Sequence, residues 1–161
     1  QLFHNYGYEN ISLHGFAGAF FDRREWYPRL GFDQIYFGEE LAKKLTSAKK
    51  CGFAFRGICD VDIAFFIREL LLDTRKTRPQ FIYWVTLNSH LPVSKAAIPD
   101  SGAAYEENIS LSSVKQINIL TRVLAKTLSA IAELALTPGL PDTRFVLLRQ
   151  ESFLILKEFH L

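Results

Sequence analysis

The sequence predicts an α/β protein, a three-layer α/β/α domain with a mostly parallel sheet. Segments typical of strands alternate with segments typical of helices, and strands separated by such helices imply right-handed crossovers between parallel strands covered on both faces. An unbroken apolar stretch from Phe81 ends abruptly in Asn88, Ser89 and His90 before Pro92. A buried strand that delivers polar side chains to its carboxyl end is how an open α/β sheet builds a site.

Composition limits the chain to one globular domain over residues 1–161. The 161 residues are 48% hydrophobic and 22% charged, which suffices for one core and not for two. The 19 basic and 17 acidic residues are mixed in sign and leave a net charge of +2, so the pattern excludes a stripe for nucleic acid. No apolar run reaches the roughly 18 residues of a membrane span, and we expect no membrane segment in this chain.

Local patterns predict the elements of the first half. Residues 10–14 are typical of a short strand, which leads into a loop over residues 15–18 whose glycines permit tight backbone geometry near a ligand. Residues 22–30 predict one short helix that ends at Gly31. Helical propensity is also high over residues 39–48.

Periodicity predicts two longer helices in the second half. Asp60 is a suitable N-cap for a helix over residues 61–73, whose apolar positions recur every three or four residues. A longer helix is expected over residues 112–136, before a run rich in Pro and Gly. Its predicted apolar stripe is Ile117, Leu120, Leu124, Leu128, Ile131 and Ala135.

The remaining segments complete the predicted order. Residues 94–110 have no clear period and predict a long surface loop, whereas residues 143–148 predict a further strand. The segment 153–156 fits either a strand or one apolar helical turn. Cys51 and Cys59 have a spacing that suits a small disulfide-closed loop in an oxidising compartment, or two free thiols in the core of a cytosolic protein.

Several segments in a fixed order carry a resemblance to a known family. They are His14-Gly15, Phe20-Phe-Asp-Arg23, Tyr27, Leu30-Gly-Phe32, Gly57 with Asp60, and Thr86-Leu-Asn-Ser-His-Leu-Pro92. This order resembles the sulfatase-like branch of the alkaline phosphatase superfamily, and within it the lipoteichoic acid synthases and lipid A phosphoethanolamine transferases. The resemblance spans residues 5–148, so it implies a partial alkaline-phosphatase-like domain with a divergent tail over residues 149–161.

The resemblance implies metal-dependent group transfer. In the family, a Thr or Ser nucleophile beside a divalent cation (manganese, zinc or magnesium) takes the phosphoryl or sulfuryl group and passes it to an acceptor or to water. By analogy His90 is the catalytic residue at the transferred group, and Arg23 binds the phosphate or head group. Phe21, His14 and Asn88 are the other residues expected to bind substrate.

Each of these residues also has a simpler interpretation. His90 could be a hydrogen-bonded loop residue, and Arg23 could belong to a solvated helix face. His14 could organise its glycine loop through a side-chain hydrogen bond, and Asp60 is expected to be a helix cap rather than an acid.

The metal ligands of the family have no counterparts in this sequence. The family uses an early acid, the nucleophile, and an Asp-His pair just after a late strand. Here residues 143–148 lead into Arg149-Gln-Glu-Ser152 where that pair is expected, and the early acid and nucleophile would precede Gln1. We therefore expect no metal or other cofactor in this fragment, a truncated or frame-shifted ending, and no activity of the chain alone.

Together these observations predict a fragment of a phosphotransferase or sulfatase for phosphate or sulfate esters. The favoured substrate is a lipid head group in the bacterial envelope, and the parent protein is expected in the periplasm or at the extracellular face of the inner membrane. The resemblance also favours the Cys51–Cys59 disulfide. The alternative is a non-catalytic module that binds an anionic glycan or lipid head group, and a homodimer through a bare sheet edge is a further expectation.

Overall fold

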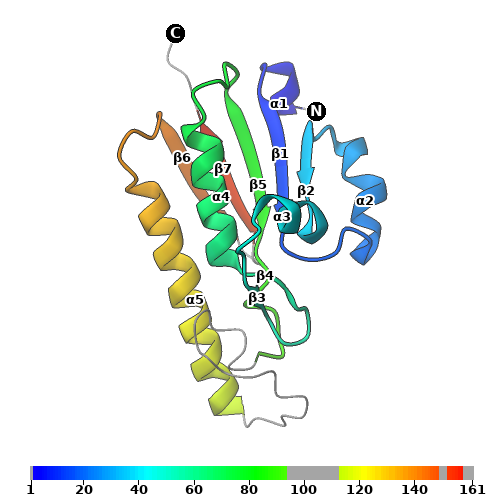
Figure 1. The fold of residues 1–161 in the computed structure, drawn as a ribbon, viewed down its shortest axis with the longest axis vertical. Coiled ribbons are helices and arrows are strands. Elements are labelled where there is room, and N and C mark those ends of the chain that lie inside the picture. Colours follow the sequence, from blue (N-terminus) through cyan, green and yellow to red (C-terminus); the bar gives the residue numbers. More distant parts are fainter. Residues whose placement is uncertain (1, 94–112, 149–151, 158–161) are drawn as a thin grey trace.

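The computed structural model describes residues 2–93, 113–148 and 152–157, which contain a five-stranded sheet of order β2-β1-β5-β7-β6 (Figure 1). Strand β1 is parallel to β2 and to β5, whereas β7 is antiparallel to β5 and to β6. Every strand of this sheet except β7 therefore has the same direction, and the predicted α/β class is confirmed. The strands are β1 (Glu9–His14), β2 (Gln34–Tyr36), β5 (Gln80–Val85), β6 (Thr143–Leu148) and β7 (Ser152–Lys157).

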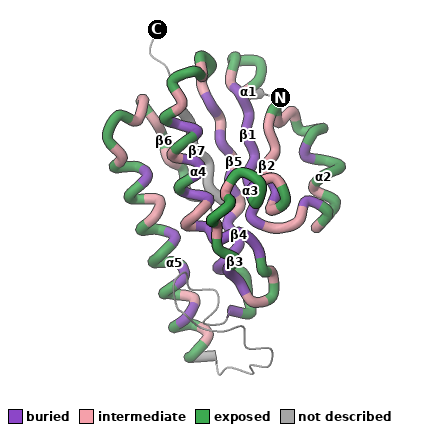
Figure 2. Tube along the Cα trace, viewed as in Figure 1, coloured by how far each residue is buried: buried purple, intermediate pink, exposed green. Residues whose placement is uncertain are grey.

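Helices cover one face of the sheet and bury its alternate residues (Figure 2). The helices of the structure are α1 (Leu2–Asn5), α2 (Arg23–Trp26), α3 (Gly38–Lys44), α4 (Asp60–Leu72) and α5 (Ser113–Ala135). Ile11 and Leu13 of β1 and Ile82 and Trp84 of β5 are fully buried in one core cluster. The helical residues in the same cluster include Leu41, Ile63, Ala64, Phe66, Ile67, Leu70, Leu71 and Leu134.

The opposite face of β1 is covered by the irregular segment that follows this strand. Asn10 donates a side-chain hydrogen bond to the backbone oxygen of Gly31 at 3.1 Å. The Tyr83 ring of β5 stacks on Phe32, with ring centroids 6.1 Å apart. The third layer over β1 is thus a short, irregular segment, residues 20–33, rather than a long helix. It contacts β1 near both ends of the strand, at Asn10 and at His14.

The prediction of one helix over residues 22–30 is wrong. The structure has a 3-10 turn at Phe20–Asp22, the single turn α2, and a second 3-10 turn at Pro28–Leu30. Phe21 and Asp22 interrupt helical geometry because both have left-handed backbone angles, with φ of 55° and 51°. Two successive left-handed residues that are not glycine cost free energy, so the surrounding structure must hold them.

The helix predicted over residues 61–73 is confirmed as α4, but the cap is not Asp60. Cys59 is the N-cap residue, and Asp60 lies inside the first turn, where it is 1% exposed. A buried carboxylate at this position can serve backbone groups of another segment instead of its own helix. The five apolar positions that repeat along this helix are all buried, as predicted: Ile63, Phe66, Ile67, Leu70 and Leu71.

The helix predicted over residues 112–136 is confirmed as α5, and its predicted apolar stripe is only partly buried. Leu120 and Ile131 pack partly buried against the core clusters, whereas Ile117, Leu124 and Leu128 are 60%, 41% and 47% exposed. The helix instead buries the neighbouring face, formed by Ile119, Val123, Thr127 and Leu134. Both faces are apolar enough to give a period of 3.6 residues, so periodicity alone could not choose between them.

Four short or late strands were not predicted as such. Strand β2 has only three residues, and the hairpin of β3 (Lys50–Cys51) and β4 (Gly57–Ile58) has two residues on each side, too few for an alternating pattern. The segment 153–156, which fitted a strand or a helical turn, lies in β7. The loop predicted over residues 94–110 lies outside the described residues.

Strands β2 and β6 form the two edges of the sheet, and pairing of two copies through an edge stays a prediction.

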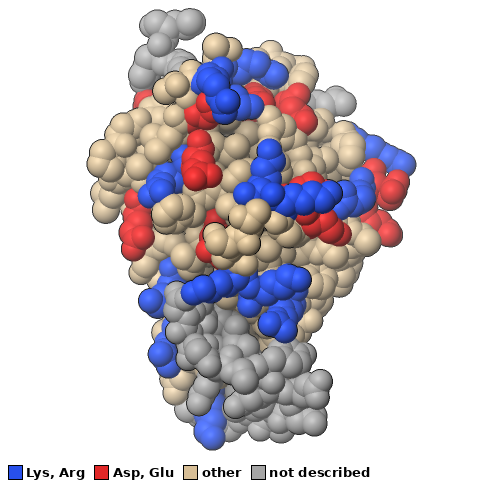
Figure 3. Space-filling view, in the orientation of Figure 1, with Lys and Arg blue, Asp and Glu red and all other residues tan. Residues whose placement is uncertain are grey.

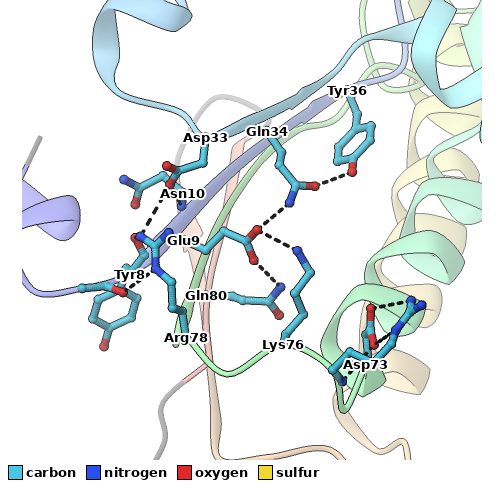
Figure 4. Close-up of polar contacts among 12 residues, drawn as sticks. Tyr8, Glu9, Asn10, Asp33, Gln34, Tyr36, Asp73, Lys76, Arg78 and Gln80 are labelled. Atoms are coloured by element: carbon cyan, nitrogen blue, oxygen red, sulfur yellow. Dashed lines mark hydrogen bonds and ion pairs between the residues drawn. The ribbon is translucent and has the colours of Figure 1, made fainter.

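The amino end of the parallel strands is closed by an internal polar network (Figure 4). The Glu9 carboxylate forms an ion pair with Lys76 at 2.7 Å and accepts hydrogen bonds from the side-chain amides of Gln80 and Gln34. Burial opposes the charged form, but these hydrogen bonds and the charge of Lys76 together lower the pKa of Glu9. The Glu9 carboxylate and the Lys76 ammonium are thus paired with each other at this end of the sheet.

Among the described residues, no helix is both long enough and apolar enough to cross a membrane. On the face seen in Figure 3, basic and acidic side chains are interspersed over the helices, and basic side chains gather near its lower part.

Candidate functional site

The candidate site lies at the carboxyl end of the parallel strands, opposite the Glu9 network. His14 is the last residue of β1, and His90 follows β5 after a short turn. The segment after β1 brings Arg23 to His14 and Phe21 to Arg23. The β3–β4 hairpin lies at the same end of the sheet (Figure 1). The carboxyl edge of a parallel sheet is where open α/β folds place their sites.

His14 is buried and positions Arg23. Its ring is 3% exposed, and its Nδ1 lies 3.1 Å from the backbone oxygen of Val85. Since a carbonyl oxygen can only accept, Nδ1 carries the proton and Nε2 is left as an acceptor. Nη1 of Arg23 donates to that Nε2 at 2.9 Å. The neutral imidazole therefore fixes the guanidinium without neutralising its charge.

Burial and neighbouring charges keep His14 neutral. Burial lowers its pKa from 6.5 to about 4, the bond to Val85 opposes this, and the charges of Arg23 and His90 lower the pKa further. The influence of both charges indicates that Arg23 and His90 lie near the same ring. The geometry and the charges thus bring three of the predicted site residues into one region.

This shifted pKa predicts a loss of stability in mild acid. As the pH falls from 6.5 to about 4, the unfolded chain binds a proton at His14 before the folded chain does. The folded state is therefore expected to lose about 3 kcal/mol from this group across that window. The free energy of unfolding, measured at pH 7 and pH 4, should fall by about that much more in the wild type than in His14→Gln. Equal losses in the two proteins would contradict the assignment.

Phe21 and Arg23 are presented together by the left-handed turn. Phe21 is 68% exposed, and the Arg23 guanidinium lies over the Phe20 and Phe21 rings at 5.7 and 5.4 Å. Nε1 of Trp26 donates to the backbone oxygen of Phe21 at 2.9 Å and so ties the turn to α2. Strained backbone of this kind is typical of functional sites, where the strain aims a side chain that relaxed geometry would turn away.

A wall of phenyl rings links this turn to His90. The Phe20 ring is 4.9 Å from that of Phe55, and Phe16 contacts both at 5.3 and 5.6 Å. The Phe55 ring in turn meets the His90 imidazole at 4.3 Å in an edge arrangement. Nδ1 of His90 donates to the backbone oxygen of Leu91 at 2.8 Å, which leaves Nε2 for a ligand.

A pocket of about 350 Å³ adjoins this wall. Phe16 lines both, and Lys50, Arg56 and Gly57 line the pocket further along. The glycine is required there, because a Cβ atom at position 57 would lie 2.2 Å from the backbone oxygen of Gly15. Its charged lining consists of two basic side chains and the acidic Glu39, so the pocket is suited to a polar group.

Asp60 and Asn88 form the support beneath the site. The Asp60 carboxylate accepts hydrogen bonds from the backbone N–H groups of Leu87 at 3.0 Å and Asn88 at 2.9 Å. In return, the backbone N–H of Asp60 donates to the side-chain oxygen of Asn88 at 2.6 Å. This reciprocal arrangement fixes the start of the loop that carries His90. From the sequence, Asp60 was expected to be only a helix cap.

The structure divides the predicted substrate-binding residues into two groups. Arg23, Phe21 and His90 lie within reach of a ligand, whereas His14 and Asn88 are 3% and 1% exposed and are engaged by protein groups. Direct contact of those two with substrate stays a prediction. The sequence analysis assigned no site role to three phenylalanines of the phenyl wall, Phe16, Phe20 and Phe55. The only signal for them in the sequence was the number of phenylalanines near the glycines and cysteines of the predicted loops.

The residues at this site do not fit a metal ion. Within the described parts of the chain, no group of three or more His, Cys, Asp or Glu side chains could hold one. A divalent cation of the predicted chemistry needs several such ligands. The groups that are present, a guanidinium, an imidazole and phenyl rings, are instead suited to hold an anion and the apolar part of its ester.

A disulfide joins Cys51 to Cys59 and closes the hairpin that carries Phe55. Both cysteines are buried, at 3% and 1% exposure. Of the two alternatives left by their spacing, the structure has the disulfide.

The fold and the site define an α/β domain with a guanidinium, an imidazole and phenyl rings gathered at the carboxyl ends of its parallel strands. The family model for sulfatases matches residues 1–133. The chain therefore belongs to the sulfatase family, as its sequence motifs predicted.

A solved structure shows the same fold at low sequence identity. The chain is similar to the lipoteichoic acid synthase LtaP from Listeria monocytogenes, with a TM-score of 0.56 and 18% identity. The match covers 83% of this chain and 30% of the LtaP chain, so this chain corresponds to less than a third of that protein. Comparison with curated proteins gave no match.

Proposed function

We propose that the cluster of Arg23, His90 and Phe21 binds the anionic group of a phosphate or sulfate ester. The observation that carries this proposal is the Arg23 guanidinium, held by the neutral His14 ring at 2.9 Å beside the phenyl wall. A guanidinium can donate two parallel hydrogen bonds to one oxyanion, and its charge here is not cancelled by His14. His90 supplies a further donor when it is protonated.

The proposed parent enzyme is a metal-dependent phosphotransferase or sulfatase that acts on lipid head groups. The sulfatase family match and the lipoteichoic acid synthase fold support this class. The adjoining pocket with Lys50 and Arg56 supports a substrate that carries more than one anionic or polar group. On this proposal, the enzyme works in the bacterial envelope, in the periplasm or at the extracellular face of the inner membrane.

We further propose that the 161-residue chain binds such esters but does not turn them over. This proposal is supported by the described residues, among which no group of three or more His, Cys, Asp or Glu side chains could hold a metal ion. Purified chain, supplied with a generic phosphodiester or aryl sulfate and with manganese or zinc, is expected to release no product above the metal-only control. Turnover that requires both the chain and the metal would contradict this proposal.

The second candidate is a non-catalytic module that uses the same surface for an anionic glycan or lipid head group. The presence of anion-binding groups without a metal cluster among the described residues favours it. Sulfate affinity is measured with and without manganese at two salt concentrations. Tighter binding in the presence of manganese would show that the chain contributes to a metal site and would contradict the module, which predicts the same affinity with and without the cation.

A further inference from the structure

The disulfide hairpin contacts the loop of His90 at two separate places. Phe55 lies between the cysteines in the chain, and its ring meets the His90 ring at 4.3 Å. Asp60 directly follows Cys59, and its carboxylate accepts hydrogen bonds from Leu87 and Asn88, just before His90. One short segment therefore contacts the His90 ring and also holds the backbone that carries it.

The strand pairing of the hairpin is short. Strands β3 and β4 pair over only two residues each, and two-stranded hairpins of this kind are marginal in water. The Cys51–Cys59 disulfide closes the loop between them. Backbone bonds from Ile58 to Gly15 at 2.8 Å and from Cys59 to Lys49 at 3.0 Å anchor its returning side, and the backbone N–H of Lys49 donates to the Asp62 carboxylate on the other side. We therefore expect the position of Phe55, whose ring also packs on Phe16 and Phe20, to depend on the disulfide as well as on strand pairing.

Among the described residues, the polar contact that orients the His90 ring is the bond from its Nδ1 to the backbone oxygen of Leu91, its own neighbour. That local bond limits the ring but does not fix the side chain relative to Arg23. The contact with Phe55 is the one that connects His90, through Phe20, to the rings beneath the Arg23 guanidinium.

We propose that the disulfide-closed hairpin is a clamp, in which Phe55 is a positioning residue that sets His90 at the distance from Arg23 needed to grip one anion. The proposal rests on the anion site proposed above and adds the element that assembles it. In the clamp, the disulfide holds Phe55, Phe55 holds the imidazole, and Asp60 holds the loop.

The test compares His90 in four variants by NMR of its imidazole, first without any anion. Phe55→Leu removes the ring but keeps an apolar side chain, Phe55→Tyr keeps a ring, and Cys51→Ser with Cys59→Ser opens the loop. Phe53→Leu removes another phenylalanine from the same loop and is the matched control. The clamp predicts that the His90 ring-proton shifts caused by the Phe55 ring disappear in Phe55→Leu and in the double serine variant. They are expected to persist in Phe55→Tyr and Phe53→Leu.

Titration with inorganic sulfate then measures the consequence for binding. Sulfate affinity is expected to fall about 3- to 10-fold in Phe55→Leu, the size of one aromatic contact, and to recover in Phe55→Tyr. Unchanged His90 signals in Phe55→Leu would overturn the clamp, and this outcome does not require the double serine variant to fold. If the signals move as expected but the wild type binds no sulfate, the clamp holds and the proposed anion site fails.

Discussion

Replacement of Arg23 by Gln is expected to weaken binding of inorganic sulfate about 10- to 100-fold. The guanidinium is the one cationic side chain placed by the His14 ring, and hydrogen bonds to a charged group contribute about 1.5 to 3 kcal/mol each. Gln keeps one donor at similar reach but removes the charge and the second donor. Isothermal titration at fixed ionic strength measures the effect.

Two matched variants show whether geometry or charge is lost. Arg23→Lys keeps the charge but not the planar pair of donors, so it should recover only part of the affinity. Arg29→Gln removes an exposed arginine of the neighbouring turn and lowers the net charge by the same amount. It is expected to bind sulfate as the wild type does. Equal weakening by Arg29→Gln and Arg23→Gln would show a general charge effect and contradict a site at Arg23.

Replacement of Asp60 by Ala is expected to destabilise the fold by about 3 kcal/mol. The change leaves the backbone N–H groups of Leu87 and Asn88 buried without their acceptor, and each unsatisfied group costs about 1 to 3 kcal/mol. Chemical denaturation measures the free energy of unfolding. Asp60→Asn keeps one side-chain oxygen and should lose less.

Asp62→Ala is the control for Asp60→Ala. Asp62 lies in the same first turn of α4, and its carboxylate accepts a hydrogen bond from the backbone N–H of Lys49 at 2.9 Å, in an exposed setting. Water can replace this acceptor, so a loss of about 1 kcal/mol or less is expected. Similar losses for the two substitutions would mean that Asp60 acts through the charge of the helix terminus and not as the support of the His90 loop.

Long, strongly patterned elements could be predicted from the sequence. The helix α4 and the strand β5 were recognisable because their apolar residues repeat over many positions. The family resemblance then correctly predicted the class of fold from segments that include His14, Gly57 and Asp60. Pattern failed for β2 and for the β3–β4 hairpin, because two or three residues are too few to show a period.

The candidate site was predictable residue by residue but not in its arrangement. Arg23 and His90 could be identified from motifs. The left-handed backbone angles of Phe21 and Asp22 could not be predicted, because neither residue is a glycine. The orientation of the His14 ring depends on its bond to the backbone oxygen of Val85, in a strand far along the chain. Contacts of this kind, like that between Phe55 and His90, arise only when the chain folds.

The most direct test of the anion site is an NMR titration of the wild-type chain with inorganic sulfate in a constant chloride background. The proposal predicts saturable shifts of the Arg23 side-chain N–H, the His90 imidazole and the Phe21 ring, all with one dissociation constant. The signals of the Glu9 and Lys76 network at the opposite end of the sheet should stay unchanged. Shifts that do not saturate, or that follow other residues while Arg23 and His90 remain unmoved, would contradict the proposal.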